Sequence, residues 1–180
     1  MHVISHPHVP FTSPFCEPLK PGCKIDIYGH ASNDFKVEFL SGPHIILHLD
    51  FRFRHWASDR IVEITSASHG KWDSGIRRRN LLEPKHEFHI CVEVHKENYR
   101  IEVNGEHLTV YRHHYPYETA QALGIAGFIK VDEVQFDGFP FNTQWGQNYD
   151  YGHAGYKSYG TDHYVAPSFP EGHRLQHQFR

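Results

Sequence analysis

Hydrophobic and polar residues alternate along much of the chain, most clearly in the run IILHLDFRF at residues 45–53. Side chains on a β-strand point alternately to its two faces, so this run predicts a strand with one apolar and one polar face. The predicted apolar face contains Ile45, Leu47, Leu49, Phe51 and Phe53. The predicted polar face contains His48, Asp50 and Arg52. Such a strand either presents its polar row to a ligand or simply faces water.

Similar runs occur at residues 24–28, 35–40, 88–94, 99–103, 108–112, 125–131 and 133–136. Asn104-Gly105 lies between two of them, and this dipeptide favours a tight hairpin because both residues tolerate positive φ. Residues 118–123 suggest one short turn or helix, and the crossover helices of a parallel sheet are missing. About ten short strands at roughly ten-residue spacing predict an all-β fold, an antiparallel two-sheet β-sandwich.

Composition divides the chain into three parts. Residues 1–10 contain two prolines and few apolar side chains, so we expect an N-terminal arm. Residues 11–138 carry the strand-like runs and form the expected domain. Residues 139–180 form a C-terminal tail rich in tyrosine, glycine and histidine, with neither a strand nor a helix period. The tail is either a disordered extension, or a segment that self-associates through its tyrosines or lies on the domain.

Charge and cysteine content narrow the class of protein. A formal net charge of −3 over 180 residues offers no basic field for nucleic acid. No apolar run is long enough for a transmembrane segment, and the N-terminus lacks the order of a secretory signal. Three cysteines, at positions 16, 23 and 91, argue for reduced thiols and a cytoplasmic protein. The alternative location is the extracellular space, after export without a signal peptide.

The chain contains 18 histidines, so a metal site has to be considered. His86 and His89 are one residue short of the helical HExxH spacing, and the adjacent His113 and His114 point to opposite faces of a strand. No CxxC pair completes a zinc site. We therefore expect neither a metal site nor a cofactor.

The polar face of residues 45–53 is followed by an indole, Trp72, and by a second guanidinium, Arg77. Together these positions supply an imidazole, a carboxylate, two guanidinium groups and one aromatic plate. A sugar offers hydroxyls to charge-assisted hydrogen bonds and an apolar C–H patch to an aromatic face. The combination is therefore typical of a sugar-binding surface.

Residues 11–136 resemble the galectins, the β-galactoside-binding lectins that fold as a two-sheet sandwich. The likeness rests on three stretches in order: FKVEFLSGPHIILHLDFRF, KWDSGIRR and YRIEVNGEHLTVYRHHYPYETAQALGIAGFIKVDEVQF. The last stretch is similar to the family's hairpin and final strands. The resemblance implies a galectin-like jelly roll and a lectin.

The galectin site pattern reads His-x-Asn-Pro-Arg, then an Asn after a Val-x pair, then Trp-Gly-x-Glu-x-Arg. Four of its elements remain here: His48, Arg52, Trp72 and Arg77. The resemblance implies that His48 and Arg52 hold the axial O4 hydroxyl of galactose. It also implies that Trp72 stacks on the apolar face of the sugar and that Arg77 reaches toward a second sugar.

The other positions of the pattern differ. Asp50 and Ile64 stand for the two Asn residues, Gly75 for the Glu, Phe51 for the Pro and Asp73 for the Gly. Asp50 accepts a hydrogen bond but cannot donate one as an amide does, and Ile64 offers nothing to the O6 hydroxyl. Gly75 lacks the carboxylate that braces the two arginines, and we expect Asp50 or Asp73 to take over this role.

We therefore expect a lectin for galactose-containing glycans on glycoproteins or glycolipids, with weakened or altered specificity. The alternative is a non-lectin scaffold that has lost sugar binding and acts through its sheet edges and tail. An enzyme is not expected. Glycoside hydrolysis needs two carboxyl groups at a set separation, and Asp50 and Asp73 are the only candidate pair on this face. Single-domain galectins often pair through sheet edges, so both a monomer and a homodimer are compatible with the sequence.

Overall fold

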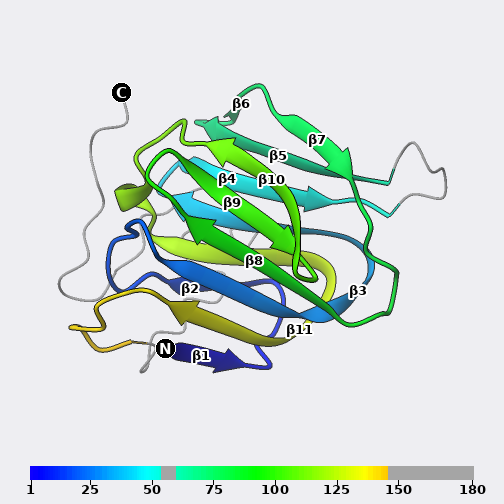
Figure 1. Ribbon diagram of the computed structural model, residues 1–180, viewed down its shortest axis with the longest axis horizontal. Coiled ribbons are helices and arrows are strands. Elements are labelled where there is room, and N and C mark those ends of the chain that lie inside the picture. The colour runs from blue at the N-terminus through cyan, green and yellow to red at the C-terminus, as the bar shows by residue number, and fades with distance from the viewer. Residues whose placement is uncertain (54–59, 146–180) are drawn as a thin grey trace.

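The computed structural model describes residues 1–53 and 60–145, which form antiparallel β-strands (Figure 1). The strands are β1 (His2–Ser5), β2 (Phe11–Pro14), β3 (Lys24–Ser41), β4 (His44–Phe51), β5 (Ile61–Ser68), β6 (Lys71–Trp72), β7 (Ile76–Arg79), β8 (Phe88–Val94), β9 (Asn98–Val103), β10 (Glu106–Arg112) and β11 (Ala122–Asp137). A single 3-10 turn in the described residues, η2 (Tyr117–Thr119), lies where a short turn was expected. No helix in these residues is long and apolar enough to cross a membrane. The all-β prediction is confirmed.

Two long strands, β3 and β11, connect the two layers of the sandwich. The first layer contains β2, the first half of β11, the second half of β3, β4 and β5, with β6 and β7 following one another along β5. The second layer contains β1, the second half of β11, the first half of β3, β8, β9 and β10. Both long strands curl at the same end of the molecule (Figure 1).

The sequence predicted two short strands in place of each long one. The β3–β11 ladder shifts register between Gly127 and Ile129 and again between Val131 and Glu133. Each shift interrupts the apolar alternation without ending the backbone pairing. The sequence pattern therefore indicates the end of a strand where the strand only bends.

Aromatic side chains fill the space between the layers. Phe35 stacks on Phe51 within the first layer at a ring separation of 4.7 Å, and on Phe88 of the second layer at 5.5 Å. All three cysteines are buried and free, which agrees with the expected reduced thiols. The hairpin between β9 and β10 turns at Asn104 and Gly105, both at positive φ, as predicted.

A register shift in β4 corrects one part of the predicted apolar face. Leu47 pairs with Phe39, but Ile45 pairs with the next residue of β3, Leu40, so β4 carries one extra residue at Ile46. Ile46 is therefore buried in the main core, while Ile45 packs on a separate small cluster that includes Leu40. The prediction that Ile45 shares a face with Leu47 is wrong, because one inserted residue reverses the side-chain parity.

The expected N-terminal arm is partly a strand. Residues 2–5 form β1 and pair with β11, where His2 lies opposite Phe136 and Ser5 opposite Glu133. Ile4 packs against the main core. Only Ile4 of the two apolar side chains of β1 packs on the core, while Val3 is exposed, so the segment gives little sequence signal. The unpaired edge of β11 supplies the hydrogen-bond partners that make the segment a strand.

The C-terminal boundary expected at residue 138 also lies too early. Phe139 and Trp145 are buried in the main core. The carboxylate of Glu17 accepts hydrogen bonds from the backbone N–H groups of Phe141 and Asn142, at 2.9 and 2.8 Å, and from Trp145 Nε1 at 2.8 Å. Residues 139–145 therefore belong to the domain. The tyrosines of the expected tail lie outside the described residues.

Candidate functional site

The polar face of β4 opens into a hollow of about 300 Å³. Its lining residues come from β4 and the residue after it, from β5, from β6 and from the break between β6 and β7: His48, Asp50, Arg52, Glu63, Thr65, Trp72, Asp73 and Gly75. Both β6 and β7 pair with β5, so the break at residues 73–75 lies beside it. Six of the eight positions expected at the site from sequence thus line one hollow.

The imidazole of His48 is held from the neighbouring strand. Glu38 of β3 lies directly opposite His48, and its Oε2 atom is 2.6 Å from His48 Nδ1. The carboxylate is buried, and Lys36 Nζ lies 3.3 Å from its other oxygen. This contact fixes the orientation of the ring and leaves Nε2 as the nitrogen available to a ligand. The sequence analysis did not identify Glu38.

An exposed indole lies beside this imidazole. The ring centroids of Trp72 and His48 are 4.6 Å apart, and Trp72 is 52% exposed although it is a large apolar residue. Trp72 comes from β6, which pairs with β5 opposite Ala67. The hollow therefore has an aromatic plate and a hydrogen-bonding ring along one side.

A carboxylate of β5 connects the two arginines. Arg52 Nε donates to Asp50 at 2.8 Å, and this hydrogen bond raises the pKa of Arg52 further above its usual value. Arg52 Nη2 lies 3.4 Å from one oxygen of Glu63, and Arg77 Nε lies 3.2 Å from the other. Asp50, one of the two residues expected to brace the arginines, therefore holds Arg52. The group that bridges both arginines, however, is Glu63. Asp73 does not take this role, because its carboxylate is engaged elsewhere.

The carboxylate of Asp73 belongs to a network between the layers. Its Oδ2 atom accepts from Ser66 Oγ at 2.6 Å and lies 3.3 Å from His114 Nδ1. The hydroxyl of Tyr111, from β10, lies 2.7 Å from Ser66 Oγ. Burial by itself raises the pKa of Asp73, but hydrogen bonds from Ser66, Tyr115 and His114 outweigh it and lower this pKa. The network joins the rim of the hollow to the second layer.

A family model for galactoside-binding lectins matches residues 10–136. The chain belongs to the galectins. A probable galaptin, lec-8 of Caenorhabditis elegans, is 44% identical over 183 residues and covers 99% of this galectin and 100% of its own length. Probable galaptin lec-7 of the same nematode is 33% identical, over 81% of this chain and 82% of its own.

Solved structures support the fold of this galectin. The crystal structure of galectin LEC-6 from Caenorhabditis elegans superposes with a TM-score of 0.70 at 19% identity, over 76% of this chain and 96% of that one. Sheep galectin-11 in complex with glycerol gives a TM-score of 0.62 at 17% identity, over 71% and 96%. At such identities the likeness concerns the fold alone. The predicted galectin-like sandwich is confirmed.

Two expected site residues of this galectin do not line the hollow: Arg77, which is paired with the lining residue Glu63, and Ile64. Ile64 is fully buried in the core and lies opposite Leu49, so it does not stand where an Asn would contact a ligand. Thr65 lies opposite His48 and lines the hollow instead. Its Oγ1 donates to the backbone oxygen of Asp73 at 3.0 Å. Strand parity was the missed signal, since Glu63 and Thr65 alternate with the apolar side chains of β5.

In this galectin, Gly75 stands where the family pattern has its Glu, and the position leaves little room for a side chain. A Cβ atom at Gly75 would lie 2.9 Å from the backbone oxygen of Ile64 and 3.0 Å from Thr65 Cβ. The chain at this position therefore passes too close to β5 to carry any side chain without moving. Glu63, directly opposite Arg77 in the β5–β7 ladder, supplies the carboxylate instead.

A buried histidine at the start of β4 is expected to make the stability of this galectin sensitive to acid. Burial, with a smaller contribution from His69, lowers the pKa of His44 from 6.5 to about 4. The unfolded chain therefore binds this proton at a higher pH than the folded chain. We expect the free energy of unfolding to fall as the pH drops from 6.5 towards about 4.

Urea unfolding at pH values on either side of this interval checks the expectation. His44→Gln should show a smaller loss of stability between the two pH values than the wild type, whereas the exposed His107→Gln should match the wild type. An equal loss in all three proteins would contradict this role of His44.

Proposed function

We propose that this galectin binds galactose-containing glycans in the hollow over β4–β7. The observation that carries the proposal is the 4.6 Å contact between the rings of His48 and Trp72, with Arg52 lining the same hollow. A sugar ring needs an aromatic plate and directional hydrogen-bonding groups within the width of one ring, and these three side chains provide both.

Each group has a separate role in the proposed complex. The indole of Trp72 covers the C–H face of galactose, while His48 and Arg52 bind its O4 hydroxyl. The Nδ1 contact with Glu38 leaves the other ring nitrogen of His48 for the sugar. Arg77, held by Glu63, reaches a second sugar in the chain.

We expect binding to lactose to be weaker than in a site with the full galectin pattern. The Asp50 carboxylate is engaged with Arg52, and a carboxylate cannot donate as an amide does. The Thr65 hydroxyl donates its only proton to the backbone of Asp73. Each hydrogen bond lost to the sugar weakens binding by about tenfold, and so the ligand of highest affinity is expected to be a different or longer galactoside.

The same contacts favour binding without catalysis. Glycoside hydrolysis needs one carboxylic acid that keeps its proton near neutral pH. Asp50 accepts a hydrogen bond from Arg52 at 2.8 Å. The pKa of Asp73 is lowered, which is the opposite of what a general acid requires. Asp73 is therefore not suited to protonate a leaving group, and the Asp50 carboxylate is already engaged with Arg52.

Calorimetric titration of the full chain with lactose and with cellobiose tests the proposal. The two disaccharides differ in the orientation of one O4 hydroxyl, the group assigned to His48 and Arg52. Lactose should bind and cellobiose should not. Equal binding of both would overturn the assignment of O4. A glycan array without any bound galactoside would overturn the proposed function and favour the scaffold alternative.

Replacing Glu63 with alanine is expected to weaken lactose binding by about tenfold, corresponding to about 1.4 kcal/mol. Arg77 loses the partner that holds it, and Arg52 keeps only Asp50. The ion pairs are partly exposed, so the free energy of unfolding should change by less than about 1 kcal/mol. Titration of Glu63→Ala beside Glu102→Ala, a control on β9, measures the difference. Wild-type affinity in Glu63→Ala would contradict the bridging role.

A further inference from the structure

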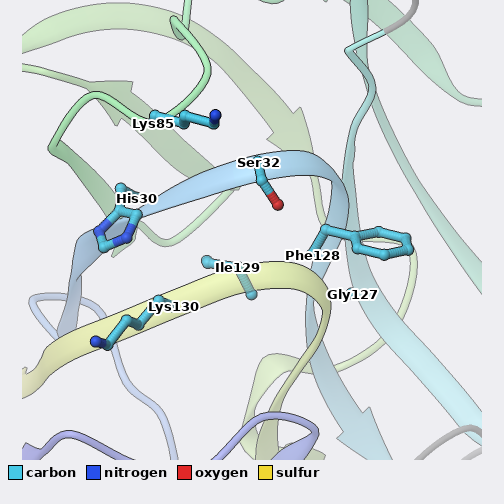
Figure 2. Close-up of a pocket in the computed structure, with 7 residues that line it drawn as sticks. All are labelled: His30, Ser32, Lys85, Gly127, Phe128, Ile129 and Lys130. Atoms are coloured by element: carbon cyan, nitrogen blue, oxygen red, sulfur yellow. The ribbon is translucent and has the colours of Figure 1, made fainter.

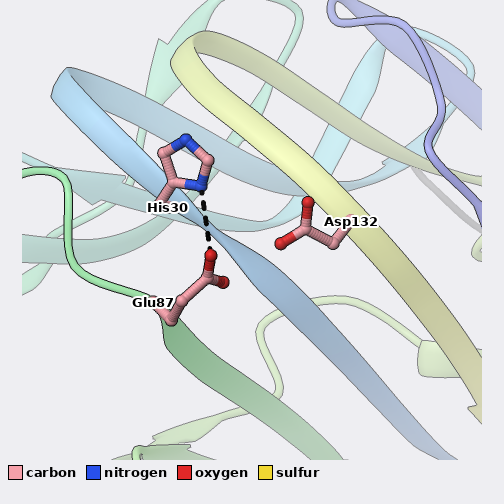
Figure 3. Close-up of side chains that lie close together, drawn as sticks. All are labelled: His30, Glu87 and Asp132. Atoms are coloured by element: carbon pink, nitrogen blue, oxygen red, sulfur yellow. Dashed lines mark ion pairs between the residues drawn. The ribbon is translucent and has the colours of Figure 1, made fainter.

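Three side chains of the kinds that ligate metals lie close together where β3 and β11 curl (Figure 3). His30 comes from β3, Glu87 from the segment before β8 and Asp132 from β11. One imidazole nitrogen and one carboxylate oxygen from each acid all lie within 4.8 Å of one another. Within the described part of the chain, this is the one group of three such ligands. None of its members lines the sugar hollow.

The imidazole of His30 has an unused nitrogen at this point. His30 Nδ1 is shielded from solvent and makes no hydrogen bond to the described residues. It lies 3.6 Å from Glu87 Oε1, too far for a hydrogen bond. Two ligands of one tetrahedral zinc ion lie about 3.4 Å apart, given metal–ligand bonds of about 2.0–2.2 Å. The spacing therefore suits two ligands with an ion between them better than a direct contact.

Asp132 reaches this point through a bulge. Val131 pairs with Gly29 and Glu133 pairs with Tyr28, so Asp132 has no partner residue on β3. A bulged residue turns its side chain away from the regular alternation of the strand. Figure 3 shows the Asp132 carboxylate directed towards the His30 ring from β11.

Two lysines lie close to the cluster without neutralising it. Lys85 and Lys130 line, with His30, a neighbouring open pocket of about 510 Å³ (Figure 2). Neither lysine forms an ion pair with Glu87 or Asp132 in the described part of the chain. Two carboxylates without a lysine partner therefore give this point a negative charge that a divalent cation can neutralise.

We propose that His30, Glu87 and Asp132 form a binding site for one divalent transition-metal ion, with zinc as the probe. The donor set of one nitrogen and two oxygens is among those that zinc accepts in proteins, and coordination positions remain for water. The bound ion joins the segment before β8 to the curl of both long strands. Binding therefore raises the melting temperature of the protein, since only the folded chain brings the three ligands together.

Calorimetric titration of the full chain with zinc chloride tests the site. The chain has many histidines, so the test compares variants: His30→Ala, Glu87→Gln and Asp132→Asn against His107→Ala, which removes an exposed histidine elsewhere. Each of the first three should lose one zinc equivalent or bind it at least about tenfold more weakly, while the control keeps it. Glu87 is 74% exposed, so its amide variant should fold normally.

Zinc-soaked crystals locate the ion directly. An anomalous peak between His30, Glu87 and Asp132 is expected. Peaks at other histidines alone, or identical titrations of all four variants, would overturn the proposal. Lactose binding should be the same with and without zinc, because the cluster and the hollow share no residue.

Discussion

Replacing Trp72 with alanine is expected to weaken lactose binding by about 30- to 100-fold, which for a weak site means no measurable binding. Among the described residues that line the hollow, the indole is the only Trp, Tyr or Phe side chain, and about half of its surface is open to a ligand. Aromatic residues at the centre of a binding site contribute about 2–3 kcal/mol or more when truncated. Because the side chain is exposed, the fold should remain intact.

Titration with lactose and urea unfolding together check this result. Phe128→Ala is the matched control, because Phe128 is 64% exposed and lies at the bend of β11 (Figure 2). It should keep wild-type affinity. Trp72→Tyr should retain part of the binding, since a smaller aromatic face remains. Wild-type lactose affinity in Trp72→Ala would remove the basis of the proposed function.

Replacing Glu17 with alanine is expected to lower the free energy of unfolding by about 3–5 kcal/mol. The carboxylate is buried and accepts from two backbone N–H groups and from the indole of Trp145. Removing it leaves these donors without their acceptor and loosens Trp145, which packs on Phe136 and Phe139. The loss is large because hydrogen bonds to a charged group are stronger than neutral ones.

Urea unfolding measures the change for Glu17→Ala. Glu17→Gln should lose less, because an amide oxygen in the place of Oε1 still accepts the two hydrogen bonds from Phe141 and Trp145. Glu83→Ala removes an exposed carboxylate and should match the wild type. If Glu17→Ala unfolds at the same urea concentration as Glu83→Ala, residues 139–145 are not held by this carboxylate.

The polar row of β4 was predictable because strand parity depends only on local sequence. His48, Asp50 and Arg52 line one hollow, as their alternate spacing indicated. The family pattern placed Trp72 beside them, although β6 is only two residues long. The pattern failed at Ile64, because the motif fixes a distance along the chain and the fold places that side chain in the core.

Residues from neighbouring strands could not be assigned in this way. Glu38 and Glu63 reach the site because β3 and β5 pair with β4 in one particular register. Both residues alternate with apolar neighbours, so the sheet face on which each side chain lies could be predicted. The sequence does not say which residue of one strand lies opposite which residue of the next. Register depends on bulges such as the one at Ile46, and these have no clear local signal.

By itself, the sequence determined the all-β fold, the apolar faces of most strands, the tight turn at Asn104 and the galectin pattern. These features follow from local backbone preferences and from side-chain parity. The tertiary structure alone decided that Glu63 bridges two arginines and that Glu17 holds residues 139–145. It also decided that His30, Glu87 and Asp132 meet. Such groups lie far apart in sequence, and only the pairing of long, bent strands brings them within hydrogen-bonding distance or coordination distance.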